Sequence, residues 1–327
     1  MANATVSRLG LVNNTGTNFD ELFLKVFSGE VLTSFTRNNI FNEQLHSVRT
    51  ISSGKSASFP VLGTATAAYH SVGTPLVGAN QIKANEKIIT IDDLLISQAF
   101  VAQIDELKNH YDVRATYADE LGKALAKQYD INVAKVIANA SRTSTTLSGG
   151  NGGTVLTLAN GNTNSAAVTG DELAAAIYDI AQTFDERDIP PTDRFCVLPP
   201  AEYYKLAETA TRTVDTDFNP QGNGSFASGK IQQIAGIPVM MSNSVPQTNR
   251  SAVTGENNTY SGDDSKTIGL VFHKSAVGTV KLMDMKTEIS GSDYNLMYQG
   301  TLMIAKYLLG HGVLRPECAA TIKLSAS

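Results

Sequence analysis

The chain has 327 residues, of which 42% are apolar, and it carries 26 Lys and Arg against 31 Asp and Glu. It can therefore bury a large core and is expected to form two domains, and its net charge of -5 argues against binding nucleic acid through a basic face. No apolar run is long enough to cross a membrane and no secretory leader is apparent, so we expect no membrane contact. Cys196 and Cys318 are too few for a disulfide framework and are expected to be buried free thiols.

The N-terminal part of the chain contains little that is expected to fold by itself. Residues 1 to 18 are rich in Asn, Thr, Ser and Gly without hydrophobic periodicity, which predicts an arm that orders only against a neighbour. Residues 48 to 69 combine β-branched and aromatic residues with Ser, Gly and Thr, which predicts a long hairpin. Its return strand is expected at residues 83 to 97.

The longest patterned stretch, residues 103 to 140, predicts one helix of about 57 Å. Its apolar positions recur at steps of three and four, and charged residues of both signs lie between them. These apolar positions are Ile104, Leu107, Tyr111, Ala118, Leu121, Leu125 and Tyr129. We expect a narrow buried stripe and a polar opposite face on a rod that suits an extended subunit.

The rest of the chain predicts an α/β layer followed by further strands. Residues 141 to 168 are dense in Ser, Thr, Gly and Asn and are expected to be a loop or domain boundary. Residues 247 to 266 are expected to be a second polar loop. Thr169 and Glu172 form a capping-box pattern that begins a helix. The elements expected after it are a strand at 195 to 198, a helix at 200 to 208, and strands at 237 to 241, 267 to 273 and 279 to 289. Gly310-His311-Gly312 and Pro316 are expected to split the C-terminal stretch into separate strands.

Several patterns suggest chemistry but are better explained by structure or solvation. Ser53-Gly54-Lys55-Ser56 is similar to part of a phosphate-binding loop, yet Arg49 stands where that motif needs its first glycine, and an extended segment follows. Asp92-Asp93 and Asp263-Asp264 are expected to be solvated pairs and not calcium ligands. The histidines are widely spread and are expected to be structural: His46, His70, His110, His273 and His311. We therefore predict no catalytic residue, no cofactor site and no metal site.

A series of longer segments carries a resemblance to a known family. They are ELFLKVFSGEVLTSF (Glu21 to Phe35), SVRTISSGKSASFPVLG (Ser47 to Gly63), EKIITIDDLL (Glu86 to Leu95), NHYDVRATYADELGKALA (Asn109 to Ala126), HKSAVGTVKLMD (His273 to Asp284) and IAKYLLGHGVLRP (Ile304 to Pro316). In sequence and in order they resemble the major capsid protein of short-tailed, T7-like bacteriophages. The resemblance covers most of the chain and is far more specific than any short motif.

The resemblance implies an α+β subunit with the HK97-like phage capsid fold. That fold has an N-terminal arm, an extended hairpin called the E-loop, a peripheral (P) domain with a long spine helix, and an axial (A) α/β domain. By resemblance these parts are residues 1–50 for the arm, 51–82 for the E-loop, 83–140 and 274–309 for the P domain with its spine helix at 103–140, and 141–273 and 310–327 for the A domain.

The function implied by the resemblance is structural. The protein would self-assemble into hexamers and pentamers of an icosahedral shell that encloses the double-stranded DNA genome of a tailed phage. Implied partners are other copies of the chain, a scaffolding protein, a portal protein at one vertex and a decoration or cement protein, with packaged DNA held only by weak non-specific contact. The implied location is the virion capsid, after assembly in the bacterial host cytoplasm. The alternative is an α/β nucleotide-binding or enzymatic domain, which has only fold-level support.

The E-loop is the first candidate surface for contact between subunits. Its small residues cannot offset a backbone ordering cost of about 1 to 2 kcal/mol per residue by packing within one subunit, so we expect it to use a neighbour's surface. Its expected apolar anchors are Phe59, Val61, Leu62 and Tyr69, and Lys55 is expected to meet an acidic or carbonyl-lined site at the rim.

The second candidate surface is a charged strand face in the P domain. Asp284, Lys286 and Glu288 alternate with Met283, Met285 and other less polar residues, which predicts one buried face and one wet face. The three charged side chains are the candidate contacts there.

Overall fold

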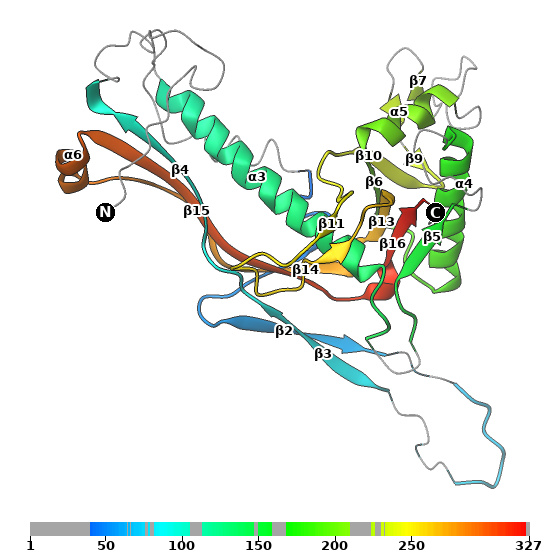
Figure 1. Ribbon diagram of the computed structural model, residues 1–327. Coiled ribbons are helices and arrows are strands. Elements are labelled where there is room, and N and C mark those ends of the chain that lie inside the picture. The colour runs from blue at the N-terminus through cyan, green and yellow to red at the C-terminus, as the bar shows by residue number, and fades with distance from the viewer. Residues whose placement is uncertain are drawn as a thin grey trace. The chain divides into compact units, whose positions relative to one another are not determined.

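The computed structural model describes residues 40–63, 65, 67–75, 78, 82–104, 113–146, 150–158, 168–209, 224–225, 230–231 and 233–324 (Figure 1). The predicted arm up to residue 39, together with Leu107, Tyr111 and His110, lies outside these residues. The chain divides into two compact units: unit 1 is Met1–Asn42, Asp92–Asp130 and Lys281–Leu309, and unit 2 is Glu43–Ile91, Ile131–Val280 and Gly310–Ser327. Within the described ranges, no helix is long and apolar enough to cross a membrane.

Unit 1 is built on long antiparallel strands. β4 (Leu95–Ala102) pairs along its whole length with β15 (Gly300–Val313), from Ala102 opposite Gly300 to Leu95 opposite Tyr307. β14 (Val277–Ile289) lies on the other side of β15 in a sheet of order β1-β14-β15-β4. In this sheet β1 (Ser47–Thr50) comes from the part of the chain assigned to unit 2. The short helix α6 (Ser292–Tyr298) joins β14 to β15. Figure 1 shows the start of α3 running along this sheet, and the rings of Tyr129 and Tyr307 meet there edge to face, 6.4 Å apart.

The long helix α3 (Val113–Ala140) ends at the predicted residue. Ala118, Leu121, Leu125 and Tyr129 are buried, as the apolar stripe predicts. Ile104, expected at the start of the stripe, is exposed instead. The prediction of one narrow stripe is also wrong beyond Asp130, where burial extends around most of the helix: Val133, Ala134, Val136, Ile137, Ala138 and Ala140 are all buried. That part of α3 belongs to unit 2, which covers it on more than one side.

Unit 2 contains a mixed six-stranded sheet of order β5-β16-β13-β6-β10-β9. Its strands are β5 (Thr154–Thr157), β16 (Ala319–Lys323), β13 (Thr267–His273), β6 (Arg194–Leu198), β10 (Ile237–Met241) and β9 (Gln233–Ile234). The β5-β16 and β6-β10 pairs are parallel and the others antiparallel. The central strands are almost fully buried, which is why they appear in the sequence as continuous apolar runs. Cys196 and Cys318 are buried free thiols, as predicted.

The helices of unit 2 begin where the local sequence predicts. Helix α4 (Gly170–Glu186) has the capping box, since Thr169 Oγ1 accepts from the Glu172 N–H at 3.3 Å and the Glu172 carboxylate accepts from the Thr169 N–H at 3.0 Å. Its predicted inner face is buried: Leu173, Ile177, Ile180 and Phe184. Helix α5 (Pro200–Thr209) begins at its proline.

Short elements complete the described part of unit 2. They are β2 (Ser56–Leu62), β3 (Ala84–Thr90), β7 (Gly224–Ser225), β8 (Lys230–Ile231), β11 (Asn249–Arg250) and β12 (Gly262–Asp263), with 3₁₀ turns at Lys274–Ala276 and Pro316–Cys318.

The expected return strand at residues 83 to 97 is in fact two strands in different sheets, β3 and β4. The chain leaves unit 2 between Ile91 and Asp92. The Ile91 N–H donates to the Lys55 carbonyl at 2.9 Å, whereas the Asp92 N–H donates to the Leu309 carbonyl at 3.1 Å. Two consecutive amides thus bond to different parts of the chain, which no local pattern reveals.

Two further expectations about strands are wrong. Residues 141 to 168 were expected to be a loop or a domain boundary, but Thr154–Thr157 form the strand β5 because β16 supplies a parallel partner. Gly310-His311-Gly312 was expected to end a strand, but β15 runs through it to Val313. A Cβ at Gly310 would overlap with the Thr90 carbonyl oxygen. Gly310 therefore permits a close approach between two segments of the same chain, β15 and the end of β3, and it does not break the strand.

Candidate inter-subunit contact site

Strands β2 and β3 form a separate two-stranded antiparallel hairpin in unit 2 (Figure 1). Its register runs from Ser56 opposite Thr90 to Leu62 opposite Ala84, so the predicted hairpin is present. Residues that face each other across an antiparallel pair project on the same side of the sheet. The register therefore assigns every side chain of the hairpin to one of two faces.

One face of the hairpin is buried in its own subunit and the other is exposed. Ala57, Val61 and Ile89 belong to the buried face, with Ile89 only 1% exposed. On the opposite face Leu62 is 69% exposed and Ile88 is 60% exposed. These two exposed apolar side chains make the face a candidate for contact with another molecule.

The structure separates the predicted E-loop anchors into three groups. Leu62 and Tyr69 are exposed, and so is the Lys55 side chain. Phe59 is half-buried, with the Arg49 guanidinium 5.8 Å from the centre of its ring. Val61 is buried within its own subunit and is therefore not free to anchor in a neighbour, which corrects its place among the candidates.

The outer edge of β2 is not open for the addition of another strand. Arg49 Nη1 donates to the Ser58 carbonyl at 2.7 Å, and Pro60 has no N–H to offer. A bonded carbonyl and a proline on an edge strand both oppose pairing with a further strand. Contacts through this hairpin are therefore expected to use its exposed face and its tip.

The predicted charged face of β14 is present in unit 1. Asp284, Lys286 and Glu288 are exposed, while Met285 between them is buried. Two of the charges have partners in their own unit, since Lys281 Nζ lies 3.6 Å from the Asp284 carboxylate and Lys306 Nζ lies 2.5 Å from that of Glu288. These are exposed carboxylates, and pairs of this kind stabilise a fold by about 1 kcal/mol at most.

Helix α6 carries an exposed apolar surface that the sequence analysis missed. Leu296 and Met297 are 75% and 71% exposed. The aromatic residues beside them pack on each other: the rings of Tyr294 and Tyr298 lie 4.5 Å apart, and Phe100 lies 6.4 Å from Tyr294. The signal was a cluster of large apolar residues in a short segment between Gly291 and Gly300, which is unusual for a connection between strands.

The Asp263-Asp264 pair was expected to be solvated, and for Asp264 this is wrong. Asp264 is fully buried, and its carboxylate is bound by the guanidinium groups of both Arg142 and Arg250. Burial, and then the nearby Arg142, lower the pKa of Arg250 to about 10. This ionic cluster fixes the polar segment from residue 247 to 266 against the end of α3 and is not a calcium site.

The remaining patterns have structural roles. The segment after Ser53-Gly54-Lys55-Ser56 is the strand β2, so the helix that a phosphate-binding loop requires is absent there. His273 Nδ1 accepts from the Ser275 N–H at 3.2 Å and caps a 3₁₀ turn, and buried His311 bonds the Thr279 hydroxyl at 2.8 Å. Among the residues that the structure describes, no group of three or more His, Cys, Asp or Glu could hold a metal ion.

A family model described as "Gp10A-like: Major capsid protein" matches residues 58–323. The chain belongs to this family of phage major capsid proteins. It is 34% identical over 334 residues to the major capsid protein of Escherichia phage T7, with 92% of this chain and 91% of that protein covered. The solved capsid of cyanophage P-SCSP1u is 50% identical, with a TM-score of 0.80 and full coverage of both chains. The mature capsid of bacteriophage PhiM1 is 20% identical, with a TM-score of 0.70 and coverage of 98% and 97%.

This capsid protein therefore has the HK97-like fold that the resemblance implied. Its role is structural: it forms the shell of a phage virion and is not an enzyme. The alternative of an α/β nucleotide-binding or enzymatic domain is excluded by membership of the family. The exposed surfaces described above are therefore candidates for contact between copies of the subunit.

Proposed function

We propose that the β2-β3 hairpin is an E-loop through which each capsid protein clamps a neighbouring copy in hexamers and pentamers of an icosahedral shell. The observation that carries the proposal is the exposed apolar face with Leu62 and Ile88 on a hairpin whose opposite face is already buried. Covering such a side chain contributes about 1.5 to 3 kcal/mol. Tyr69 near the tip and Lys55 supply further contacts. Phe59 lies on the inner face with Val61 and can add only the exposed part of its ring, and the buried Val61 supplies no contact.

The second contact surface of the proposal is the charged face of β14 together with helix α6, both in unit 1. Lys286 has no ion-pair partner within the described part of the chain, and Asp284 and Glu288 are exposed enough to exchange theirs for a neighbour's charges. Leu296 and Met297 of α6 add apolar area close to them in sequence. Mixed apolar and charged contacts of moderate strength, repeated by symmetry, permit correction of errors during assembly.

The division into domains is also part of the proposal. Residues 1–50 are assigned to the arm, 51–82 to the E-loop, 83–140 and 274–309 to the P domain, and 141–273 and 310–327 to the A domain. The two compact units support an organisation of this kind, although they group β3 and the end of α3 with the α/β sheet.

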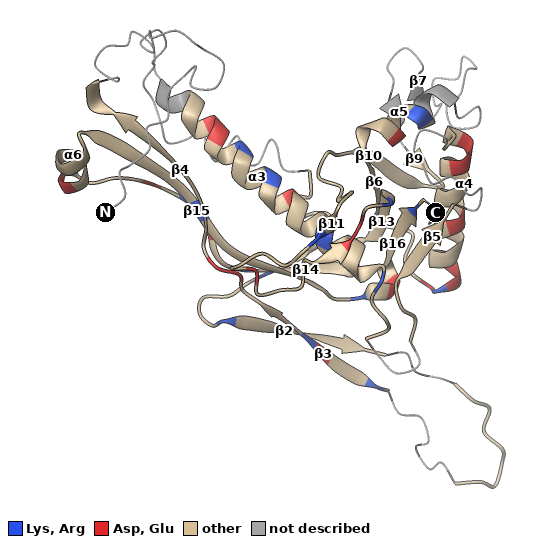
Figure 2. Ribbon diagram, in the orientation of Figure 1, with Lys and Arg blue, Asp and Glu red and all other residues tan. Residues whose placement is uncertain are grey.

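The proposed partners beyond the subunit itself are a scaffolding protein, a portal protein at one vertex and a decoration or cement protein, with assembly in the host cytoplasm. Packaged double-stranded DNA is proposed to touch the shell only weakly. In support of this, the Lys and Arg residues of the described elements are scattered among acidic ones and form no continuous stripe (Figure 2), and the chain has a net charge of -5.

The test is a full-length subunit that carries Leu62→Ser and Ile88→Ser, which changes the exposed face and keeps β2 and β3. We expect it to unfold at the temperature of the unchanged chain but to form no particles with the scaffolding protein, as followed by light scattering and electron microscopy. The unchanged chain under the same conditions is the control. Normal particles from the double variant would overturn the clamp.

A further inference from the structure

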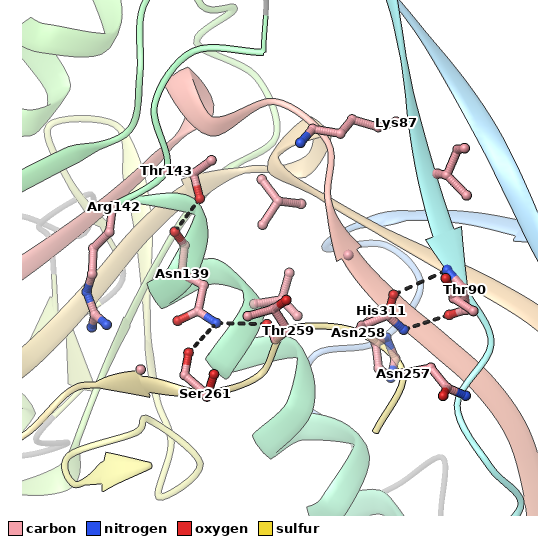
Figure 3. Close-up of a pocket in the computed structure, with 15 residues that line it drawn as sticks. Lys87, Thr90, Asn139, Arg142, Thr143, Asn257, Asn258, Thr259, Ser261 and His311 are labelled. Carbon is pink, nitrogen blue, oxygen red and sulfur yellow. Dashed lines mark hydrogen bonds between the residues drawn. The ribbon is translucent and has the colours of Figure 1, made fainter. Parts of the chain in front are cut away.

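At the root of the hairpin, at Thr90, the backbone forms the hydrogen bonds of a β-ladder with a side chain instead of with a neighbouring strand. The Thr90 N–H donates to Asn258 Oδ1 at 3.2 Å, and Asn258 Nδ2 donates to the Thr90 carbonyl at 2.6 Å (Figure 3). In an antiparallel ladder, one residue exchanges this same pair of bonds with its neighbour on the next strand. The side-chain amide of Asn258 therefore stands in for a third strand at the last residue of β3.

The direction of these bonds shows which edge is occupied. Because both polar groups of Thr90 point to Asn258, they point away from β2, and the Ser56-Thr90 pair is not hydrogen-bonded. The next residue, Ile91, donates its N–H to the Lys55 carbonyl on the β2 side. The root of the hairpin is thus held on both sides.

The segment that carries Asn258 is itself held in place by hydrogen bonds to other elements. Its neighbour Thr259 and, further on, Ser261 accept hydrogen bonds through their carbonyls from Asn139 Nδ2 of α3, at 2.9 and 3.1 Å (Figure 3). Tyr260, buried between them, accepts a bond from the backbone N–H of His311 at 2.9 Å. The segment around Asn258 is therefore fixed to the spine helix and to β15.

Apolar packing holds the hairpin against its own subunit, since Ala57 and Val61 are buried on the same face as Ile89. Ile89 fits against backbone that carries no side chain: a Cβ on Gly312 would lie 2.7 Å from Ile89 Cγ1, and one on Gly278 would lie 3.0 Å from its Cδ1. Apolar contacts are not directional, so they do not by themselves fix the angle of the backbone. The two hydrogen bonds to the backbone of Thr90, the adjacent residue, do fix it.

There is also space into which an unrestrained hairpin could turn. A pocket of about 590 Å³ lies beside the root and is lined on one side by Lys87, Ile88 and Thr90 of β3 and on another by Asn257 and Asn258. Packing alone does not fill this space. A two-stranded hairpin is only marginally stable by itself, so its direction depends on its bonds to the rest of the subunit. These include the bonds of Asn258 at the root and one from Asn85 Nδ2 to the Thr146 carbonyl, at 2.8 Å, further along β3.

We propose that Asn258 sets the direction in which the E-loop hairpin leaves the subunit, by acting as a third strand at Thr90. This role rests on the proposed function of the hairpin as a clamp, because a clamp must reach its neighbour at a defined angle. Asn258 is therefore a positioning residue.

The experiment measures direction separately from stability. Spin labels are attached at Ala84→Cys, at the far end of the hairpin ladder, and at Asp179→Cys on the exposed side of α4, and their distance distribution is recorded on the unassembled subunit. Both sites are exposed and belong to unit 2, while the native cysteines are buried. The variants compared in this background are Asn258→Ala, Asn258→Asp and the control Gln182→Ala, an exposed amide that bonds only within α4.

We expect a narrow distribution for the parent and for Gln182→Ala and a broad one for Asn258→Ala, with the melting temperature little changed. Asn258→Asp keeps the acceptor for the Thr90 N–H but loses the donor, and should be intermediate. The subunit concentration needed for assembly should rise roughly tenfold for Asn258→Ala, which corresponds to about 1.4 kcal/mol for the lost bonds.

The outcomes separate this proposal from the clamp itself. An unchanged distance distribution in Asn258→Ala refutes the positioning role, whatever happens to assembly. A broadened distribution with normal assembly supports the positioning role and refutes the clamp. A broadened distribution with weakened assembly supports both. A large fall in melting temperature together with loss of the hairpin signal would overturn the proposal, since Asn258 would then be needed for folding.

Discussion

The carboxylate of Asp130 in α3 accepts a hydrogen bond from the backbone N–H of Phe41, 3.1 Å away and 89 residues earlier in the chain. The Ile40 N–H donates to the same carboxylate at 2.9 Å. Burial raises the pKa of Asp130 from its ordinary 3.8 to about 6, although the two amide bonds act in the opposite direction. One buried carboxylate thus ties the start of the described chain to the spine helix.

This tie predicts a pH-dependent stability that Asp130→Asn removes. Because the pKa of Asp130 is higher in the folded state, the folded protein binds the proton more readily than the unfolded chain does. The contribution of Asp130 to the free energy of unfolding is therefore greatest below about pH 4. It falls by about 1 to 3 kcal/mol as the pH rises through 6. Urea unfolding of both proteins across this range measures the difference. Parallel curves for the two proteins would contradict the prediction.

Val61 and Leu62 lie on opposite faces of β2, so substitutions at these two positions should affect different properties of the protein. Val61→Ala removes a buried side chain and should lower subunit stability by about 1 to 2 kcal/mol. Leu62→Ser changes an exposed one and should leave the melting temperature unchanged, yet raise the concentration needed for assembly roughly tenfold. Calorimetry and light scattering on the same samples provide both measurements. If Leu62→Ser lowers the melting temperature as much as Val61→Ala does, the assignment of faces is wrong.

β15 lies so close to the root of the hairpin that one methyl group added at Gly310 should strongly lower the stability of the subunit. Gly310→Ala should destabilise the subunit by about 3 kcal/mol, because its Cβ would overlap with the Thr90 carbonyl oxygen. Gly291→Ala is the matched control, since nothing lies within 4 Å of its Cβ, and it should cost less than about 1 kcal/mol. Chemical denaturation compares the two. Equal effects would show that the contact relaxes without cost.

Binding to duplex DNA should be weak and only slightly dependent on salt. With basic residues scattered among acidic ones, we expect fewer than about three ion contacts per subunit. The slope of log affinity against log salt concentration, measured by fluorescence anisotropy with a labelled duplex, reports this number. A steep slope would reveal a basic surface that the described residues do not form.

Much of this protein follows from local features of the sequence. The capping box of Thr169 and Glu172, the end of α3 at Ala140 and the buried strands β6 and β13 depend on residues a few positions apart, which is the range over which helix and strand periodicity act. The family could be recognised in the same way, because its segments retain their order along the chain.

The tertiary structure alone decided the features that join distant residues. Asp264 is buried because Arg142 and Arg250 neutralise it, and β5 is a strand because β16 lies beside it. Whether Val61 or Leu62 is exposed depended on the register with β3, since a shift of one residue exchanges the two faces. These partners lie tens to hundreds of residues apart, and the free energy that selects them arises only when the chain brings them together.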